Sequence, residues 1–264
     1  MRRTPAWILW TMPVLSGAVF IALWYGLKAA FGISDWLLPT PLGILAAMGQ
    51  EMPRLLPAAG TTALGALGGF LVSAALGFLL ALPIGVSRVL RAAFYPWLLV
   101  AQMTPIIVLT PAVVIWSGGG FDGIIAVTVL ISFFPIIATT TQGLLSTDQN
   151  LVALFRMANA TTWQELWQLR VPSAMPHYLT GLKIAAALAP IGAIFAEYMV
   201  GNSAGGTGGL GFLVYRYHTQ VKIPAVFATG LTSCLLGFIF VAAVSLLNWA
   251  VLHKWHDSFE RDDH

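Results

Sequence analysis

Charged side chains are scarce in this chain, and their scarcity excludes an ordinary water-soluble domain. Only 9% of its 264 residues are charged and 58% are hydrophobic, whereas soluble domains carry roughly 25% charged residues. The mean hydropathy is +0.83. Several long runs contain no Asp, Glu, Lys or Arg, namely 4–27, 55–87, 92–121, 123–147, 184–196 and 223–253. Because about 20 apolar residues cross a bilayer core, most of these runs are long enough to span one.

Sequence motifs for catalysis and cofactor binding are also missing. No G-x-x-x-x-G-K-[ST] motif occurs, so any ATP hydrolysis must take place on a separate chain. The stretch from Gly206 to Gly211 matches G-x-G-x-x-G, but no strand precedes it, and we expect a flexible loop. The histidines lack the spacing of zinc ligands; they are His177, His218, His253, His256 and His264. Without a nucleophile and base or a metal set in the apolar runs, we expect neither an enzyme nor a cofactor site.

The apolar runs predict an all-α, polytopic membrane protein with six transmembrane helices. We place them near 7–27, 60–86, 93–116, 122–143, 180–200 and 224–252. The runs are too continuous for the alternating pattern of barrel strands. The first run is longer than the apolar region of a signal peptide, so we expect a retained span. Cys234 is the single cysteine, which excludes an intrachain disulfide.

The basic residues predict an orientation in the membrane. They are dispersed between the apolar runs, so they do not form the basic stripe of a nucleic-acid partner. With a cytoplasmic N-terminus, nine lie inside: Arg2, Arg3, Arg88, Arg91, Arg156, Arg170, Lys183, Lys254 and Arg261. Four lie outside: Lys28, Arg54, Arg216 and Lys222. This asymmetry predicts that both termini are cytoplasmic in a multi-pass protein of the bacterial inner membrane.

Prolines mark places where helices are expected to end or bend. Four of them flank two short apolar pieces in residues 34–57, which we expect to lie along the outer surface. We therefore divide the chain into an N-terminal part, 1–57, and a five-helix core, 58–264. Within the predicted third span, Pro105 and Pro111 together favour a broken helix.

Broken helices in transporters border the substrate path. On this basis the predicted translocation path comprises Gln102, Pro105, Pro111, Pro190 and Glu197. Glu197 is the only carboxylate well inside a span, which suggests a function. It also allows a structural role, in which the carboxylate bonds neighbouring backbone or hydroxyl groups.

The predicted second span carries small residues at every fourth position. They are Thr61, Gly65, Gly69, Ser73, Gly77, Ala81 and Gly85. Such a stripe lets helix backbones approach closely in lipid. Two interpretations remain at this stage, tight packing within one subunit and a seam between two copies.

The longest predicted cytoplasmic connection, 144–179, has its own helical pattern. Apolar residues recur with helical spacing, first at Leu151, Leu154, Phe155 and Ala158, then at Trp163, Leu166 and Trp167 up to Arg170. Thr162 and Glu165 have the spacing of a capping box, and Asn159 tolerates a left-handed turn. With Pro172 and Pro176 at its end, the pattern predicts a pair of short amphipathic helices that dock into a groove on another protein.

This connection resembles the cytoplasmic loop of ABC importer permeases known as the EAA loop. Counting back from Pro172, the loop's Gly falls on Asn159, its Ile on Leu169 and its Leu on Val171. Its three leading letters fall on Ala153, Leu154 and Phe155, so the Glu and the Gly of the motif are not matched.

The resemblance extends over most of the chain. The stretches LLPTP, GGF, LPIGVSR, YPWLLVAQMTPIIVLTPAVVIWSGGG, FFPII, PSAMPHYLTGLKIAA, IFAEY and GTGGLG resemble, in order, permeases of the sulfonate, taurine, nitrate and thiamine-precursor type. The resemblance implies a type I importer fold and a homodimeric pore. It also implies two cytoplasmic ATPase subunits that bind ATP and Mg, and an external substrate-binding protein. The coupling residues it implies are Leu151, Leu154, Phe155, Ala158, Asn159, Trp163, Leu166, Trp167 and Pro172.

Two other functions and several substrates remain open on sequence grounds. A secondary carrier driven by an ion gradient needs ionisable groups near the midplane, and the predicted spans offer essentially Glu197 alone. An intramembrane enzyme has no visible reactive group. The stretches QMTPIIVLTPAVVIW and GLKIAAALAPIGAIFAEY resemble more closely the thiamine-precursor pyrimidine or riboflavin type than the sulfonate type.

Overall fold

The computed structural model describes residues 6–200 and 208–256, with the side-chain surroundings of 11–200 and 208–250. The described chain consists of helices: α1 (Ala6–Ala30), α2 (Pro41–Val86), α3 (Arg88–Met103), α4 (Ile106–Trp116), α5 (Gly120–Leu145), α6 (Gln149–Met157), α7 (Thr162–Glu165), the π-helical turn η1 (Leu166–Arg170), α8 (Val171–Val200), α9 (Leu210–Thr219) and α10 (Ile223–His256). The described residues do not include Arg2, Arg3 and Arg261, which were predicted to be cytoplasmic, or the beginning of the predicted loop at Gly206.

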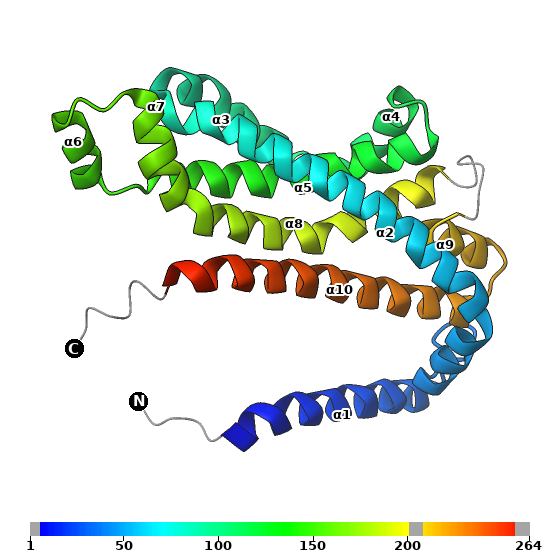
Figure 1. Ribbon diagram of the computed structural model, residues 1–264. Helices are drawn as coiled ribbons and strands as arrows, with labels where there is room; N and C mark the ends of the chain where they lie inside the picture. Colours follow the sequence, from blue (N-terminus) through cyan, green and yellow to red (C-terminus); the bar gives the residue numbers. More distant parts are fainter. Residues whose placement is uncertain (1–5, 201–207, 257–264) are drawn as a thin grey trace.

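The all-α membrane fold is confirmed. Five described helical segments are long and apolar enough to cross a membrane: Thr11–Ala30, Pro41–Val86, Gly120–Leu145, Thr162–Val200 and Ile223–Ala250. A bent pair, α3 and α4, supplies the sixth span if the two count as one. Figure 1 shows α6 and α7 at one end of the bundle and α9 at the other, with α2, α5 and α8 running between the two ends.

The third span is broken, as its prolines predicted. Helices α3 and α4 meet at an angle of 101°. Pro105 has no N–H and disfavours helical backbone at the residue before it, so Thr104 is extended with φ −67° and ψ 128°. Pro111 lies inside α4 and does not interrupt it. The predicted break in the span 93–116 is therefore confirmed, and it lies at Pro105 and not at Pro111.

The prolines of residues 34–57 do not cap two separate short pieces as predicted, because α2 begins at Pro41 and continues without interruption for 46 residues. Pro41 occupies the first helical turn, where its missing N–H is no loss, and the Thr40 hydroxyl accepts a hydrogen bond from the Gly43 N–H at 3.1 Å. Pro53 and Pro57 lie inside the helix rather than at its ends. The helix is roughly 69 Å long at 1.5 Å per residue, and its first part curves away from the bundle in Figure 1. The proposed boundary after residue 57 thus lies inside a helix.

The small residues of α2 pack within the subunit. A Cβ added at Gly65, Gly69, Gly77 or Gly85 would come within 2.7 Å of a side-chain atom of α5, on Ile124, Thr128, Ile136 and Leu144 respectively. Each glycine therefore meets the residue 59 positions later, so the two helices are parallel and in constant register. The Ser73 hydroxyl adds a hydrogen bond to the Val129 carbonyl at 3.1 Å. For these positions the interpretation of packing within one subunit is confirmed.

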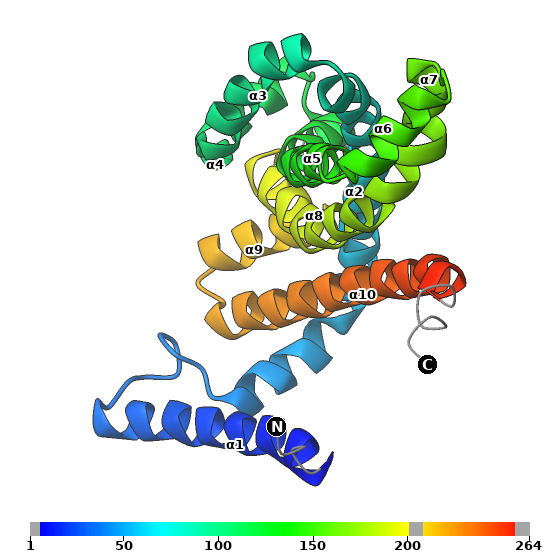
Figure 2. The ribbon, with the colours of Figure 1, turned by 90° about the vertical axis from the view of Figure 1, so that its left-hand side faces the viewer.

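Helix α8 covers a second side of α5. Gly143 approaches His177, Gly181 approaches Thr139 and Gly192 approaches Thr128, an order that makes the two helices antiparallel. In contrast, α1 stands apart from α5 and α8 in Figures 1 and 2. Its Trp24 donates a hydrogen bond from Nε1 to the Pro39 carbonyl at 3.1 Å and makes an edge contact with the Phe227 ring.

Candidate coupling segment

Residues 146–170 form a compact segment between the end of α5 and the beginning of α8, which Figure 2 shows at the side of the bundle. Helix α6 begins where the Asp148 carboxylate accepts a hydrogen bond from the Asn150 N–H at 2.8 Å. Val152 of this helix is buried, whereas Leu151 and Leu154 are exposed. The apolar side chains at these two positions therefore face outward.

Asn159 ends α6 in the left-handed conformation that the sequence predicted, with φ 56°. The Ala160 N–H donates to the Phe155 carbonyl at 3.0 Å, which closes the last turn of the helix. Ala158 and Asn159 are both exposed. Asparagine thus supplies the backbone shape that glycine usually provides at a helix end.

The capping box lies one residue earlier than predicted. Thr161, rather than Thr162, accepts from the Gln164 N–H at 3.2 Å, and the Gln164 side chain accepts from the Thr161 N–H at 2.8 Å. Thr161 has the same hydroxyl as Thr162, and Gln164 lies three residues later, so the earlier pair satisfies both N–H groups equally well. This arrangement leaves Glu165 free for an ion pair.

The predicted partner-facing residues of the second helix point in two directions. Trp163 is 68% exposed and Trp167 41% exposed, and their rings contact each other edge to face with centroids 5.5 Å apart. Leu166, by contrast, is 8% exposed and packs in a cluster with Ile84 and Leu144. The two tryptophans are therefore accessible to a partner, whereas Leu166 anchors the segment to the bundle.

Pro172 does not end the second helix. It lies in the first turn of α8, and α7, η1 and α8 follow one another without a break over Thr162–Val200. The predicted pair of separate helices is corrected to one separate helix, α6, and a second that continues into the membrane span. An apolar groove of about 480 Å³ lies between this helix and α2, lined by Leu79, Leu82, Pro83, Val86, Thr162, Trp163 and Leu166.

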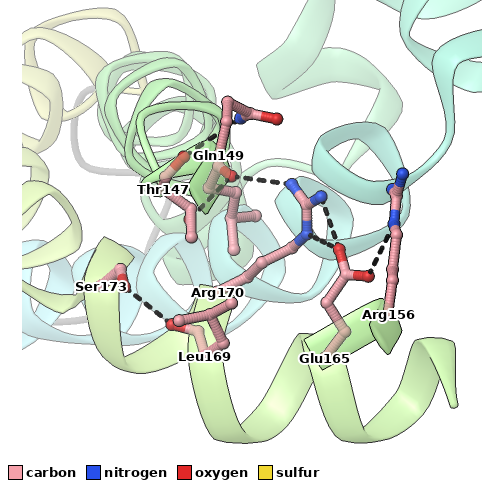
Figure 3. Close-up of polar contacts among 8 residues, drawn as sticks. Thr147, Gln149, Arg156, Glu165, Leu169, Arg170 and Ser173 are labelled. Carbon is pink, nitrogen blue, oxygen red and sulfur yellow. Dashed lines mark hydrogen bonds and ion pairs between the residues drawn. The ribbon is translucent and has the colours of Figure 1, made fainter. Parts of the chain in front are cut away.

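A buried ion pair holds the segment to α5 (Figure 3). Glu165 Oε1 accepts from Arg170 Nη2 at 2.6 Å and from Arg170 Nε at 2.7 Å. Arg170 Nη1 also donates to the Leu144 carbonyl, at the end of α5, at 3.2 Å. Arg156 of α6 approaches Glu165 Oε2 at 3.7 Å. We call these residues, Arg156, Glu165 and Arg170, the clasp.

The clasp could not be predicted from the sequence, for a physical reason. Glu165 and Arg170 are five residues apart, whereas ion pairs on an α-helix are three or four apart. The π-helical turn at Leu166–Arg170 widens the helix and brings positions five apart onto one side. No pattern in the sequence signals a π turn at this place.

The family model described as binding-protein-dependent transport system inner membrane component matches residues 73–252. The chain belongs to this family. The family describes multi-pass inner-membrane permeases of ABC importers, whose ATPase is a separate subunit.

The permease is similar to several named relatives. It is 40% identical over 187 residues to a formylaminopyrimidine transport permease of Halalkalibacterium halodurans, which covers 71% of this chain and 72% of the relative. It is 27% identical over 259 residues to a putative aliphatic sulfonates transport permease of Bacillus subtilis, covering 95% and 90%. A riboflavin transport system permease of Chloroflexus aurantiacus is 28% identical over 171 residues, covering 65% and 62%.

A solved structure supports the same fold for the permease. A chain of the methionine ABC transporter MetNI in inward-facing conformations matches with a TM-score of 0.50 and 21% identity. The match covers 74% of the permease and 98% of that chain. This likeness establishes the type I importer fold alone.

The predicted translocation residues of the permease lie in two different environments. Gln102, Pro105 and Pro111 are exposed around the break between α3 and α4, whereas Pro190 and Glu197 are buried in α8. Their part in a path remains a prediction. Lys183 is one of the nine basic residues that the predicted orientation places in the cytoplasm. It lies inside α8 and is exposed.

Glu197 joins three helices of the permease. It is 1% exposed, and its Oε2 accepts from the Thr62 hydroxyl at 2.8 Å and from the Gly211 N–H at 3.0 Å. The Thr62 oxygen in turn accepts from the Leu210 N–H at 2.9 Å. These bonds satisfy free N–H groups at the beginning of α9. The geometry matches the structural interpretation of Glu197, in which it bonds hydroxyl and backbone groups.

Proposed function

We propose that two copies of the permease form the pore of an ATP-driven importer, which receives a small nutrient from an external binding protein and releases it into the cytoplasm by alternating access. In this proposal two ATPase subunits bind ATP and Mg on the cytoplasmic side. They contact α6 and α7, and both ends of the chain are cytoplasmic. The observation that carries the proposal is the structure of segment 146–170. Its outward side is apolar and aromatic, and the clasp holds its inward side to α5.

The exposed side chains of the segment support a protein contact. Leu151, Leu154, Trp163 and Trp167 are all exposed, although they stand among polar residues that are unsuited to hydrocarbon. Apolar patches with a polar rim mark interaction sites, and tryptophan is enriched at the centres of interfaces. The clasp ties the segment to the end of α5. A movement of the protein bound to the exposed side chains would therefore be passed on to α5.

The arrangement of the chain supports the proposed orientation. In Figure 1 the first residues of α1 and the last residues of α10 lie at the same end of the bundle as α6 and α7. The basic residues Arg88 and Arg91 begin α3, directly after the end of α2 that lines the groove beside Trp163. Positive charge gathered at this end favours a cytoplasmic location.

For the substrate we propose a thiamine-precursor pyrimidine. The support is the 40% identity to a relative named for formylaminopyrimidine, against 28% and 27% for relatives named for riboflavin and aliphatic sulfonates. The test is uptake of radiolabelled formylaminopyrimidine by proteoliposomes that hold the permease with its ATPase, the binding protein being added outside. Competition by an excess of ethanesulfonate but not of a second pyrimidine would assign the permease to the sulfonate type instead.

The coupling role is tested by Trp163→Asp and Trp167→Asp. A carboxylate at the centre of an apolar contact weakens binding. We therefore expect at least tenfold less ATPase to co-purify with the variants, while the permease still inserts into the membrane. The matched control is Val221→Asp, at an equally exposed apolar residue in the turn after α9, at the other end of the bundle. Normal co-purification and normal ATP-dependent uptake in both tryptophan variants would refute the proposed contact.

A further inference from the structure

The apolar groove between α2 and α7 runs along one face of α2. Its wall on this helix is formed by residues with helical spacing, namely Leu79, Leu82, Pro83 and Val86. From the first to the last of them the wall extends about 10 Å along the helix axis. All four belong to the charge-free run 55–87. The groove therefore continues the apolar surface of a membrane span.

The groove opens to the outside of the subunit. Leu79 on one wall is 59% exposed and Trp163 on the other is 68% exposed. Apart from the Thr162 hydroxyl and the indole N–H of Trp163, the lining side chains are apolar. An open apolar surface of this kind marks a site for an apolar group from outside the subunit.

Two arginines stand at the end of the groove. The chain passes from Val86 through Ser87 to Arg88, so the Cα atom of Arg88 is at most about 7 Å from that of Val86. Arg91 is three residues further along α3, and residues three apart are neighbours on a helix. In Figure 1 the beginning of α3 lies next to α7, whose Trp163 lines the groove. Both basic side chains therefore begin at the rim of the groove.

Neither arginine has a partner in the described part of the subunit. Within residues 11–200 and 208–250, Arg88 and Arg91 donate no hydrogen bond and form no ion pair. Arg91 is nevertheless half-buried, and a charge shielded from water is costly without a counter-charge. Glu165, the carboxylate of the neighbouring segment, is already bonded to Arg170. The two guanidinium groups thus favour an anion that the subunit does not supply.

We propose that this groove binds an anionic phospholipid, with an acyl chain along α2 and the headgroup phosphate on Arg88 and Arg91. A phospholipid supplies both features in one molecule, because it joins an apolar chain to phosphate oxygens, which arginine binds through two parallel hydrogen bonds. A free phosphate would leave the apolar walls uncovered. An apolar helix would leave the arginines without a counter-charge. In the proposed orientation the lipid belongs to the cytoplasmic leaflet, where anionic lipids attract basic residues near the surface.

Photolabelling of the purified permease tests the site. The permease is placed in phosphatidylcholine nanodiscs with a small fraction of a photoactivatable lipid, either phosphatidylglycerol or phosphatidylcholine, with the diazirine at the same place in the acyl chain. Mass spectrometry then locates the label. We expect at least tenfold more label from phosphatidylglycerol on residues 79–86 and 162–166, because two cations attract the net negative headgroup. Equal labelling by the two probes would overturn the proposal.

The role of the arginines is tested by the double variant Arg88→Gln/Arg91→Gln. Labelling of the groove by phosphatidylglycerol should fall to the level of phosphatidylcholine. The matched control is Arg216→Gln/Lys222→Gln, which removes two exposed basic residues in and after α9, at the other end of the bundle. This control should label as the unmodified permease does. A preference for phosphatidylglycerol that survives the loss of Arg88 and Arg91 would contradict the site.

Filling the groove tests the position of the acyl chain. Leu79→Trp adds a large ring at an exposed position of the wall, and should reduce labelling of residues 162–166 by both probes. Leu42→Trp, at a residue of α2 that is 71% exposed and does not line the groove, should leave the labelling unchanged. Equal labelling in the two variants would place the acyl chain elsewhere.

A protein occupant is detected with a benzophenone attached to Leu82→Cys in a Cys234→Ser background. We expect cross-links to lipid alone. A cross-link to a second copy of the permease, or to the ATPase when it is added, would assign the groove to that protein and overturn the proposal. None of these measurements needs transport, so a failure of the proposed pore function is distinguishable from a failure here.

Discussion

The ion pair of Glu165 with Arg170 shows how much depends on single residues in the coupling segment. Both side chains are largely shielded, with 11% and 13% exposure, whereas the Arg156 side chain is 69% exposed. Removing one partner from a buried pair leaves an uncompensated charge, which is costly, whereas exposed pairs contribute little. The three residues of the clasp are thus expected to differ widely in importance.

We predict that Glu165→Gln destabilises the segment by about 3 kcal/mol, because Arg170 is left buried without its carboxylate. The matched control, Arg156→Gln, should cost less than about 1 kcal/mol. Chymotryptic cleavage within residues 149–170 of the detergent-solubilised permease, whose leucine and aromatic sites neither substitution removes, measures both effects together with thermal unfolding. Equal resistance of the two variants to the protease would contradict the importance assigned to the buried pair.

At this scale the sequence predicted conformations better than contacts. The left-handed turn at Asn159 followed from the tolerance of that residue for positive φ. The capping box was displaced by one position because adjacent threonines compete for the same role. Leu166 was grouped with the tryptophans because its spacing fits their stripe, and only the position of α2 and α5 shows that it faces the bundle.

Among the elements, α2 and α5 approach each other closely through the glycines of α2. A methyl group at Gly69 would overlap the Thr128 side chain, whereas one at Gly60, in the same helix, meets nothing within 4 Å. We predict that Gly69→Ala destabilises the permease by about 1–3 kcal/mol through overpacking. Gly60→Ala should not destabilise it, and should add up to about 1 kcal/mol because alanine favours a helix over glycine. Thermal unfolding in detergent compares the two, and a similar loss in both would indicate that the close approach is not the cause.

The break between α3 and α4 is a second property of elements. Pro105→Ala restores an N–H and allows the two helices to join, so we predict that α3 and α4 straighten. Spin labels at Leu90 and Ile115 in a Cys234→Ser background should move apart, from roughly 24 Å for the bent pair toward roughly 38 Å for one straight helix. Pro111→Ala, inside the continuous α4, should leave the distance as it is. An unchanged distance in Pro105→Ala would mean that packing, not proline, sets the bend.

Helix existence was predictable from the sequence, but helix continuity was not. The charge-free runs located every span, because burial in lipid demands apolar residues and internal hydrogen bonds. Pro53, Pro57 and Pro172 were interpreted as helix ends, yet each lies within a helix. A proline costs a helix a few kcal/mol locally, and tertiary packing, which a single sequence does not display, outweighs that cost here.

For the whole molecule, the proposed function requires a separate source of energy. Among the described carboxylates of the spans, Glu197 is already bonded by Thr62 and Gly211, which leaves little for an ion-driven carrier. We predict that the purified permease alone, in liposomes with a proton or sodium gradient, takes up neither formylaminopyrimidine nor ethanesulfonate. Adding the ATPase, the binding protein and ATP should start the uptake. Gradient-driven uptake by the permease alone would favour the secondary carrier.

The constant register between α2 and α5 also limits how the molecule can move. Sliding one helix along the other by a single residue would set full side chains where four glycines now admit their neighbours, and α8 is interlocked with α5 in the same manner. These three helices therefore form one rigid body. The 101° bend of α3 and α4 and the loosely held α1 lie outside this body. In the proposed importer, a change of access would therefore come from rotation of whole subunits or from these two parts.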